Sequence, residues 1–152
     1  MLAVPPAHPL SSGALRTLRA VCEAVFSTNE GPPAPHLLDY CVTQFAISIA
    51  HSGFRSRVVF GMALLAMAVI APVLIFRFPG LHRLPLPDRV RALTKMEESA
   101  VLAAPVLAVK AIICICFYEH PDAQKAVGFT GVGFFSPALD PAIPAVPRTL
   151  AS

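Results

Sequence analysis

The stretch RSRVVFGMALLAMAVIAPVLIFRFPG, residues 55–80, decides the fold of this chain. Its central 19 residues, 58–76, carry no charge, and Arg57 and Arg77 stand at the two ends. A helix rises 1.5 Å per residue, so this segment would extend about 28 Å, just enough to cross the hydrocarbon core of a bilayer. The same pattern is typical of the central buried helix of a small helical domain. The composition and the flanking segments bear on the choice between a membrane span and a core helix.

The composition is unusually apolar for a chain of 152 residues, a length that suits one domain. Hydrophobic residues make up 55%, charged residues make up 14%, and the mean hydropathy is +0.65. Soluble domains carry about 25% charged residues. This chain is therefore expected to lie in a membrane or to cover much of its surface with a partner. The net charge is only +3, and no basic cluster with aromatic residues occurs, so no nucleic-acid partner is expected.

Helical periodicity predicts an all-α fold of about five helices, two of them very apolar. The helical domain is expected over residues 11–131, after an extended lead-in at residues 1–10 and before an irregular, proline-rich tail at residues 132–152. Ser11 or Ser12 is expected to cap the first helix, Gly53 to end the second, and Asp88 to cap the fourth. The expected helices cover residues 11–27, 36–53, 58–76, 88–99 and 100–118, with a short helical turn near 123–127.

No pattern of catalytic, cofactor-binding or metal-ligating residues stands out in the sequence. The five histidines fall near expected loops or helix ends, and the four cysteines lack zinc-site spacing and are expected to be buried. Glu97 and Glu98 are adjacent, so on a helix they point about 100° apart and cannot act as a facing pair. We therefore expect no catalytic residue, no metal site and no cofactor in this chain. Lys110 lies within an apolar helix, where it either reaches the surface, pairs with a carboxylate or contacts a partner.

The start of the chain, MLAVPPAHPLSSG, has no basic n-region, no long apolar run and no twin arginine. It therefore does not predict a secretion signal, and a cytoplasmic location, or one at the cytoplasmic membrane, is expected. With the basic residues that follow position 76 on the cytoplasmic side, a span would require residues 1–57 to be translocated without a signal. Lys110, near the middle of the second apolar helix, would cost about 2.5–3.5 kcal/mol on insertion. Both points favour a buried helix, with a membrane anchor over residues 58–76 as the alternative.

Three segments carry a resemblance to a known family. They are LSSGALRTLRAVCEAVF at residues 10–26, FPGLHRLPLPDRVRALTKMEES at residues 78–99, and APVLAVKAIICICFYEHPDAQKAVGFTG at residues 104–131. Their order resembles the gluconate 2-dehydrogenase subunit 3 family, also called the gamma or small subunit. The order is similar as well to the region fused ahead of the flavin domain in long-chain alcohol oxidases of the glucose-methanol-choline type.

The resemblance implies a helical accessory subunit with no cofactor of its own. Such a subunit binds and stabilises a large flavoprotein, and FAD belongs to that partner. A third alternative, separate from the resemblance, is a peripheral protein that lays its apolar helices on a membrane surface and delivers lipophilic substrates to the flavoprotein. Each candidate contact residue could instead pack in the chain's own core. The candidate contact residues are Phe76, Phe78, Leu81, Leu84, Lys110, Phe117, Tyr118 and Phe129.

Overall fold

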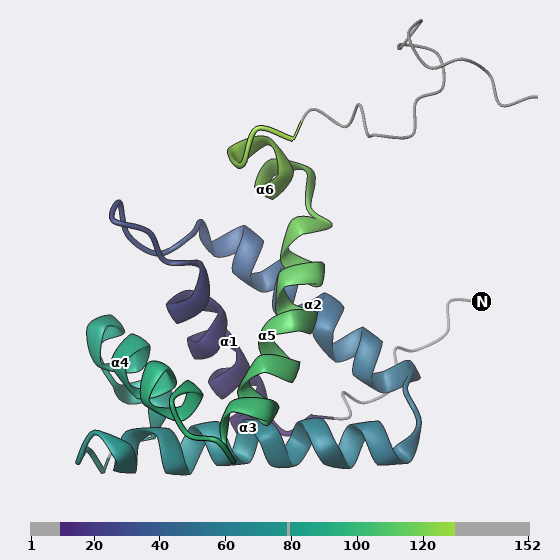
Figure 1. Ribbon diagram of the computed structural model, residues 1–152. Helices are drawn as coiled ribbons and strands as arrows, with labels where there is room; N and C mark the ends of the chain where they lie inside the picture. Colours follow the sequence, from purple (N-terminus) through teal and green to yellow (C-terminus); the bar gives the residue numbers. More distant parts are fainter. Residues whose placement is uncertain (1–9, 79, 130–152) are drawn as a thin grey trace, which may run out of the picture.

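The computed structural model describes residues 10–78 and 80–129, and within them it is all-helical, as the periodicity predicts (Figure 1). The expected tail at residues 132–152 and all but the last residue of the expected lead-in lie outside the described residues. The helices are α1 Ser12–Phe26, α2 Pro35–His51, α3 Phe54–Leu74, the 3₁₀ helix η1 Leu81–Arg83, α4 Leu86–Glu97, α5 Ala103–Tyr118 and α6 Pro121–Ala126.

The long helix α3 forms the base of the molecule, and the other helices pack on one side of it (Figure 1). Helices α1, α4 and α5 pack on α3, while α2 packs mainly along α1 and α5 and meets α3 over a smaller area. A single hydrophobic core lies between these layers. Every long helix contributes large, fully buried side chains to this core: Leu18, Phe45, Leu64, Met67, Met96 and Ile113.

The helix ends follow the local sequence with two corrections. Ser11 caps α1 as predicted, because its Oγ accepts a hydrogen bond from the amide of Ala14 at 3.2 Å. Asp88 was predicted to cap α4, but the helix begins two residues earlier, at Leu86. Pro87 is compatible with this earlier start, since a proline is tolerated in the first turn of a helix. Gly53 does not end α2 in a left-handed turn; it precedes α3 as an extended residue with φ of −64°.

Arg89 holds three elements together in a way that the sequence did not suggest. Its Nε donates to the carbonyl of Leu84 at 2.7 Å, and one terminal nitrogen donates to the carbonyl of His82 at 3.1 Å. The other terminal nitrogen pairs with the carboxylate of Glu23 on α1. The Arg89 side chain is only 15% exposed, so these charge-assisted contacts fix α4 and η1 against α1.

Candidate interaction surface

The side of α3 that faces away from the core is apolar from residue 58 to the end of the helix. Its buried positions are Ala63, Leu64, Met67, Ala71 and Pro72, which all point toward the other helices. The opposite positions recur mainly every three or four residues, the spacing of one helical face. We call them the outer face of α3, and they are 46–60% exposed: Val58, Val59, Met62, Leu65, Val69 and Val73.

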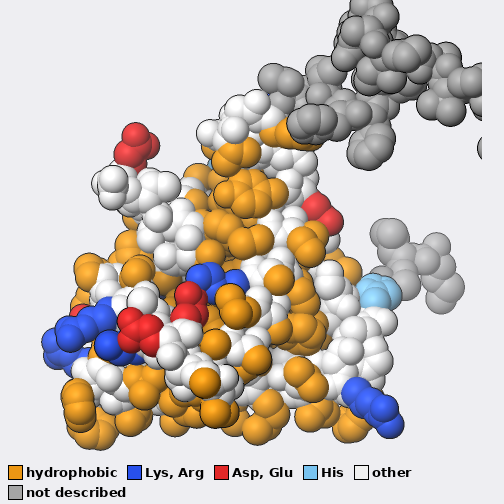
Figure 2. Space-filling view, in the orientation of Figure 1, with side chains coloured by type: hydrophobic (Ala, Val, Ile, Leu, Met, Phe, Trp, Pro, Cys, Tyr) orange, Lys and Arg blue, Asp and Glu red, His pale blue; other side chains and the backbone are white. Residues whose placement is uncertain are grey.

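Charged residues mark the two ends of this outer face. Arg57 lies at the start of α3 and donates to the carbonyls of Ala50 and Ser52, at 2.8 Å and 3.2 Å, which satisfies the end of α2. Arg77 lies beyond the end of α3, with its Nε 3.8 Å from Oδ2 of Asp88. Hydrophobic side chains follow the edge of the molecule along α3, with basic side chains near both ends (Figure 2). A surface of this kind, apolar in the middle and polar at its limits, is typical of an interaction site.

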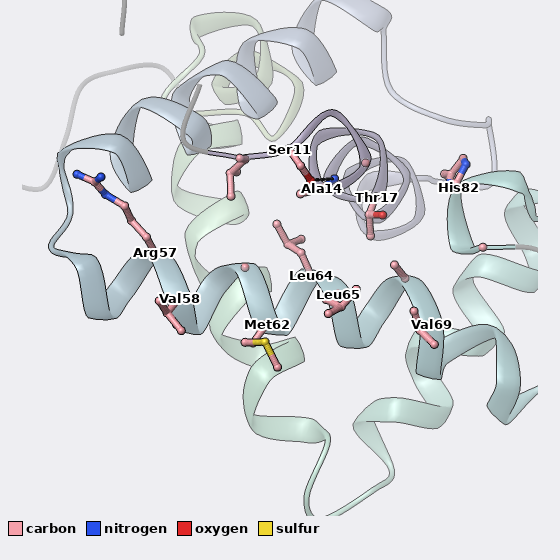
Figure 3. A pocket seen from close by; sticks show the side chains of 15 residues that line it. Ser11, Ala14, Thr17, Arg57, Val58, Met62, Leu64, Leu65, Val69 and His82 are labelled. Atoms are coloured by element: carbon pink, nitrogen blue, oxygen red, sulfur yellow. Dashed lines mark hydrogen bonds between the residues drawn. The ribbon is translucent and has the colours of Figure 1, made fainter. Parts of the chain in front are cut away.

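A groove of about 630 Å³ runs between α3 and the start of α1 and extends the outer face inward (Figure 3). Its floor shares Met62, Leu65 and Val69 with the outer face, and Gly13, Ala14 and other small residues of α1 form part of the opposite wall. Arg57 and His82 lie at opposite ends (Figure 3). The small residues on the α1 side leave room for side chains from another molecule. Desolvation, with smaller effects from Arg16, Arg83 and Arg89, lowers the pKa of His82, which favours its neutral form at the groove end.

Phe76 and Phe78 continue the apolar surface beyond the end of α3. They are 92% and 95% exposed, more than any other large apolar side chain in the described part of the chain. Phe76 has a left-handed backbone with φ of 56°. This conformation belongs to the Schellman motif that ends α3. The amide of Phe76 donates to the carbonyl of Val73 at 3.0 Å, and the amide of Arg77 donates to the carbonyl of Pro72 at 2.9 Å. Glycine normally occupies this position, since a side chain there is strained by about 1–2 kcal/mol.

The predicted contact residue Lys110 has a partner within the chain. Its Nζ lies 2.6 Å from Oε1 of Glu97, and both side chains are half-buried. The pair joins α5 to α4. Of the three roles expected for Lys110, pairing with a carboxylate is the one that the geometry shows, and contact with a partner stays a prediction.

The other predicted contact residues divide into core and surface. Leu81 and Leu84 are fully buried beneath η1, and Phe117 is also buried, stacked on Phe26 with ring centroids 3.9 Å apart. A partner that docks without rearranging the chain cannot reach Leu81 or Leu84, so these two are corrected to core residues. Phe117 packs in the core but also lines a surface pocket beside Tyr118, so a contact through it stays a prediction. Tyr118 and Phe129 are 41% and 47% exposed near the opposite end of the molecule from α3.

The cysteines are free thiols and mostly belong to the core. Cys22 and Cys41 are buried with their Sγ atoms 3.7 Å apart, and the Cys41 thiol donates to the carbonyl of Ile113 at 3.4 Å. The hydrogen bond with Cys41, together with burial, raises the pKa of the Cys22 thiol well above its usual range. Burial also raises the pKa of Cys116 to about 11. These pKa values hold Cys22 and Cys116 in the unreactive protonated form.

By length and composition alone, α3 is the single described helix that could cross a membrane, and 28% of its most apolar window is buried in the fold. Helix α5 is also apolar but has 16 residues, a length of about 24 Å, which is short of a bilayer core. Comparisons with protein-family models, with curated proteins and with solved structures find no match for this chain. The resemblance to the subunit 3 family therefore stays a prediction.

Proposed function

We propose that this chain is a non-catalytic accessory subunit that binds and stabilises an FAD-dependent oxidoreductase of the glucose-methanol-choline type. The observation that carries the proposal is the outer face of α3. It is an apolar surface over residues 58–73 that the chain's own fold does not cover. Obligate partner subunits bury surfaces of this kind. The class of the partner comes from the family-like segments at residues 10–26, 78–99 and 104–131.

The energetics indicate which part of the surface matters most. Complete burial of a large apolar side chain contributes about 1.5–3 kcal/mol, so six half-exposed side chains on the outer face would contribute about 5–9 kcal/mol. Association itself costs about 4–15 kcal/mol. The outer face alone would therefore give weak binding. Phe76 and Phe78, which are almost fully exposed, would add about 2–3 kcal/mol each, and we expect them to decide the affinity.

A membrane anchor is the second candidate, favoured by the length of α3 and by the small buried share of its apolar window. The packing of the other helices weighs against a span in this fold. Helix α4 contacts α3 and carries five charged residues among its twelve, and each would cost about 2.5–3.5 kcal/mol near the bilayer centre. For α3 to span, it would have to leave the bundle and take Leu64 and Met67 out of the core. A protein partner requires no such rearrangement.

Co-purification tests the proposal. The tagged chain is co-expressed with an FAD-dependent oxidoreductase of the glucose-methanol-choline type from the same organism, and flavin absorbance is measured in the eluate. We expect the wild-type chain to retain the flavoprotein and the double variant Leu65→Gln/Val69→Gln to lose it. Ile47→Gln, a similar change at an exposed apolar residue of α2, is the matched control and should retain it.

Two results would contradict the proposal. One is a wild-type eluate without flavin, together with a flavoprotein that is equally soluble without this chain. The other is retention of the chain in the membrane pellet after alkaline carbonate extraction, which would support the anchor instead.

A further inference from the structure

Two histidines and an aspartate meet at the end of the molecule away from α3. His36 lies in the first turn of α2, and His120 and Asp122 lie at the junction between α5 and α6. Nε2 of His36 is 3.4 Å from Oδ2 of Asp122, and Nδ1 of His120 is 3.9 Å from the same oxygen. One ligand atom from each residue lies within 4.8 Å of the other two. Sequence spacing could not indicate this cluster, because more than eighty residues separate its two parts.

The local structure places the three residues beside one another. Pro35 and Pro121 fix the first turns of α2 and α6, directly beside His36 and His120. Helix α2 packs along α5, which brings the two helix junctions together. The ring of Tyr40, one turn after His36, packs edge-on against His120 with centroids 4.9 Å apart. The cluster is therefore supported by packed elements on both sides.

The distances are close to those of a transition-metal site. In a tetrahedral zinc site, bonds of about 2.0–2.1 Å place neighbouring ligand atoms about 3.3 Å apart. The His36–Asp122 separation already meets this value, and the His120–Asp122 separation exceeds it by about half an ångström. His36 and Asp122 have exposed side chains that can rotate. The separation between the two histidine nitrogens is at most 4.8 Å, so rotation of the exposed side chains would have to shorten it for all three to bind one ion.

Two neighbouring groups compete with a metal, and neither blocks it. The amide of Asp122 donates to Nδ1 of His120 at 3.2 Å, so this nitrogen presents its lone pair and is the unprotonated one. A metal would replace that hydrogen bond. Nζ of Lys125 lies 3.8 Å from Oδ1 of Asp122, which leaves Oδ2 for the metal.

We propose that His36, His120 and Asp122 form a binding site for a divalent transition-metal ion of the Zn²⁺ type. Two imidazoles and one carboxylate are a ligand set that Zn²⁺ accepts, and water would fill the fourth position. The ion would join the start of α2 to the α5–α6 junction and stabilise this end of the fold. The site lies away from the outer face of α3 and does not depend on the function proposed above.

The test uses the untagged full chain, titrated with Zn²⁺ by calorimetry and with Co²⁺ by visible absorption. We expect one ion per chain, Co²⁺ bands of a tetrahedral site, and a higher melting temperature with Zn²⁺, since the ion binds the folded state. His36→Ala and Asp122→Asn should each weaken binding by about tenfold or more. Both side chains are exposed, so circular dichroism should show an unchanged helix content. His51→Ala, at the other end of α2, is the control and should bind Zn²⁺ like the wild type.

The absence of saturable Zn²⁺ binding by the wild-type chain would overturn the proposal. So would binding that both His36→Ala and Asp122→Asn leave unchanged. Loss of binding in His51→Ala with retention in His36→Ala would also overturn it, because the ion would then lie elsewhere.

Discussion

Replacing Phe76 with glycine should make the isolated chain more stable and the complex weaker. Phe76 adopts a left-handed backbone with φ of 56°, and its ring is 92% exposed. The ring therefore contributes little to folding, while its Cβ strains the end of α3. A residue that is unfavourable for the fold and presents an apolar ring to solvent is what we expect of a partner contact.

The magnitude follows from two opposing terms. Glycine removes a strain of about 1–2 kcal/mol at this position. It also makes the unfolded chain more flexible, which offsets about 0.4–1 kcal/mol of that gain. The net stabilisation of Phe76→Gly should therefore lie between about 0 and 1.6 kcal/mol, with a central value of about 0.8 kcal/mol. Phe78 is equally exposed, but its backbone is not left-handed. Glycine there relieves no strain and only makes the unfolded chain more flexible, so Phe78→Gly should lower the free energy of unfolding by about 0.4–1 kcal/mol.

The assay is urea unfolding of the two variants and the wild type, followed by circular dichroism, which gives the free energy of unfolding. Flavoprotein binding is measured on the same samples. Both variants should bind at least about tenfold more weakly, because each loses a ring worth more than 1.4 kcal/mol at the interface. If Phe76→Gly is less stable than the wild type, the reasoning from its backbone is wrong. If it binds the flavoprotein as the wild type does, Phe76 is not a contact.

Three further predictions concern the core, the Arg89 contacts and the thiols. Leu64→Ala should lower the free energy of unfolding by about 3–4 kcal/mol, because Leu64 is fully buried. Leu65→Ala, one residue along and exposed, should lower it by less than about 1 kcal/mol; similar losses in denaturant titrations would show that α3 packs differently. Arg89→Ala should lower the free energy of unfolding by about 2–3 kcal/mol in the same titrations. Arg89→Lys should restore little of this stability, because lysine cannot make the three contacts of the guanidinium group. A lysine variant as stable as the wild type would refute this. In the folded chain a thiol reagent should modify Cys114 before Cys22, since Cys22 is buried and its pKa is raised more. Mass spectrometry of samples taken at successive times measures the two rates, and equal rates would contradict the prediction.

The sequence was sufficient for the helical class and for most helix positions. Ser11 at the start of α1 and the proline-rich connector before α2 gave clear boundaries. The predicted start of α4 at Asp88 is wrong by two residues. The prediction assigns Pro87 to the preceding loop, whereas Pro87 lies in the first turn of the helix. Leu81 and Leu84 lie in a segment without helical periodicity, and only the packing of η1 against α1 and α3 shows them to be core residues.

The surface itself was harder to predict than the helices. Helix α3 is apolar on all sides after Arg57, so no polar residue marks which face is turned outward. The exposed set became visible only once α1, α4 and α5 were placed against Leu64 and Met67. The ligand set of His36, His120 and Asp122 was missed for a related reason. Its members are distant in sequence, and only the packing of α2 along α5 brings them together.

Site-specific photo-cross-linking from the outer face of α3 tests the central claim most directly. A photoreactive amino acid is placed at position 65 in cells that express the chain with its flavoprotein, and the adducts are identified by mass spectrometry. A matched probe replaces Glu30, an exposed residue in the loop between α1 and α2. The account predicts adducts between position 65 and the flavoprotein, with few from position 30. Adducts of position 65 with lipid alone, or equal yields from both positions, would contradict it.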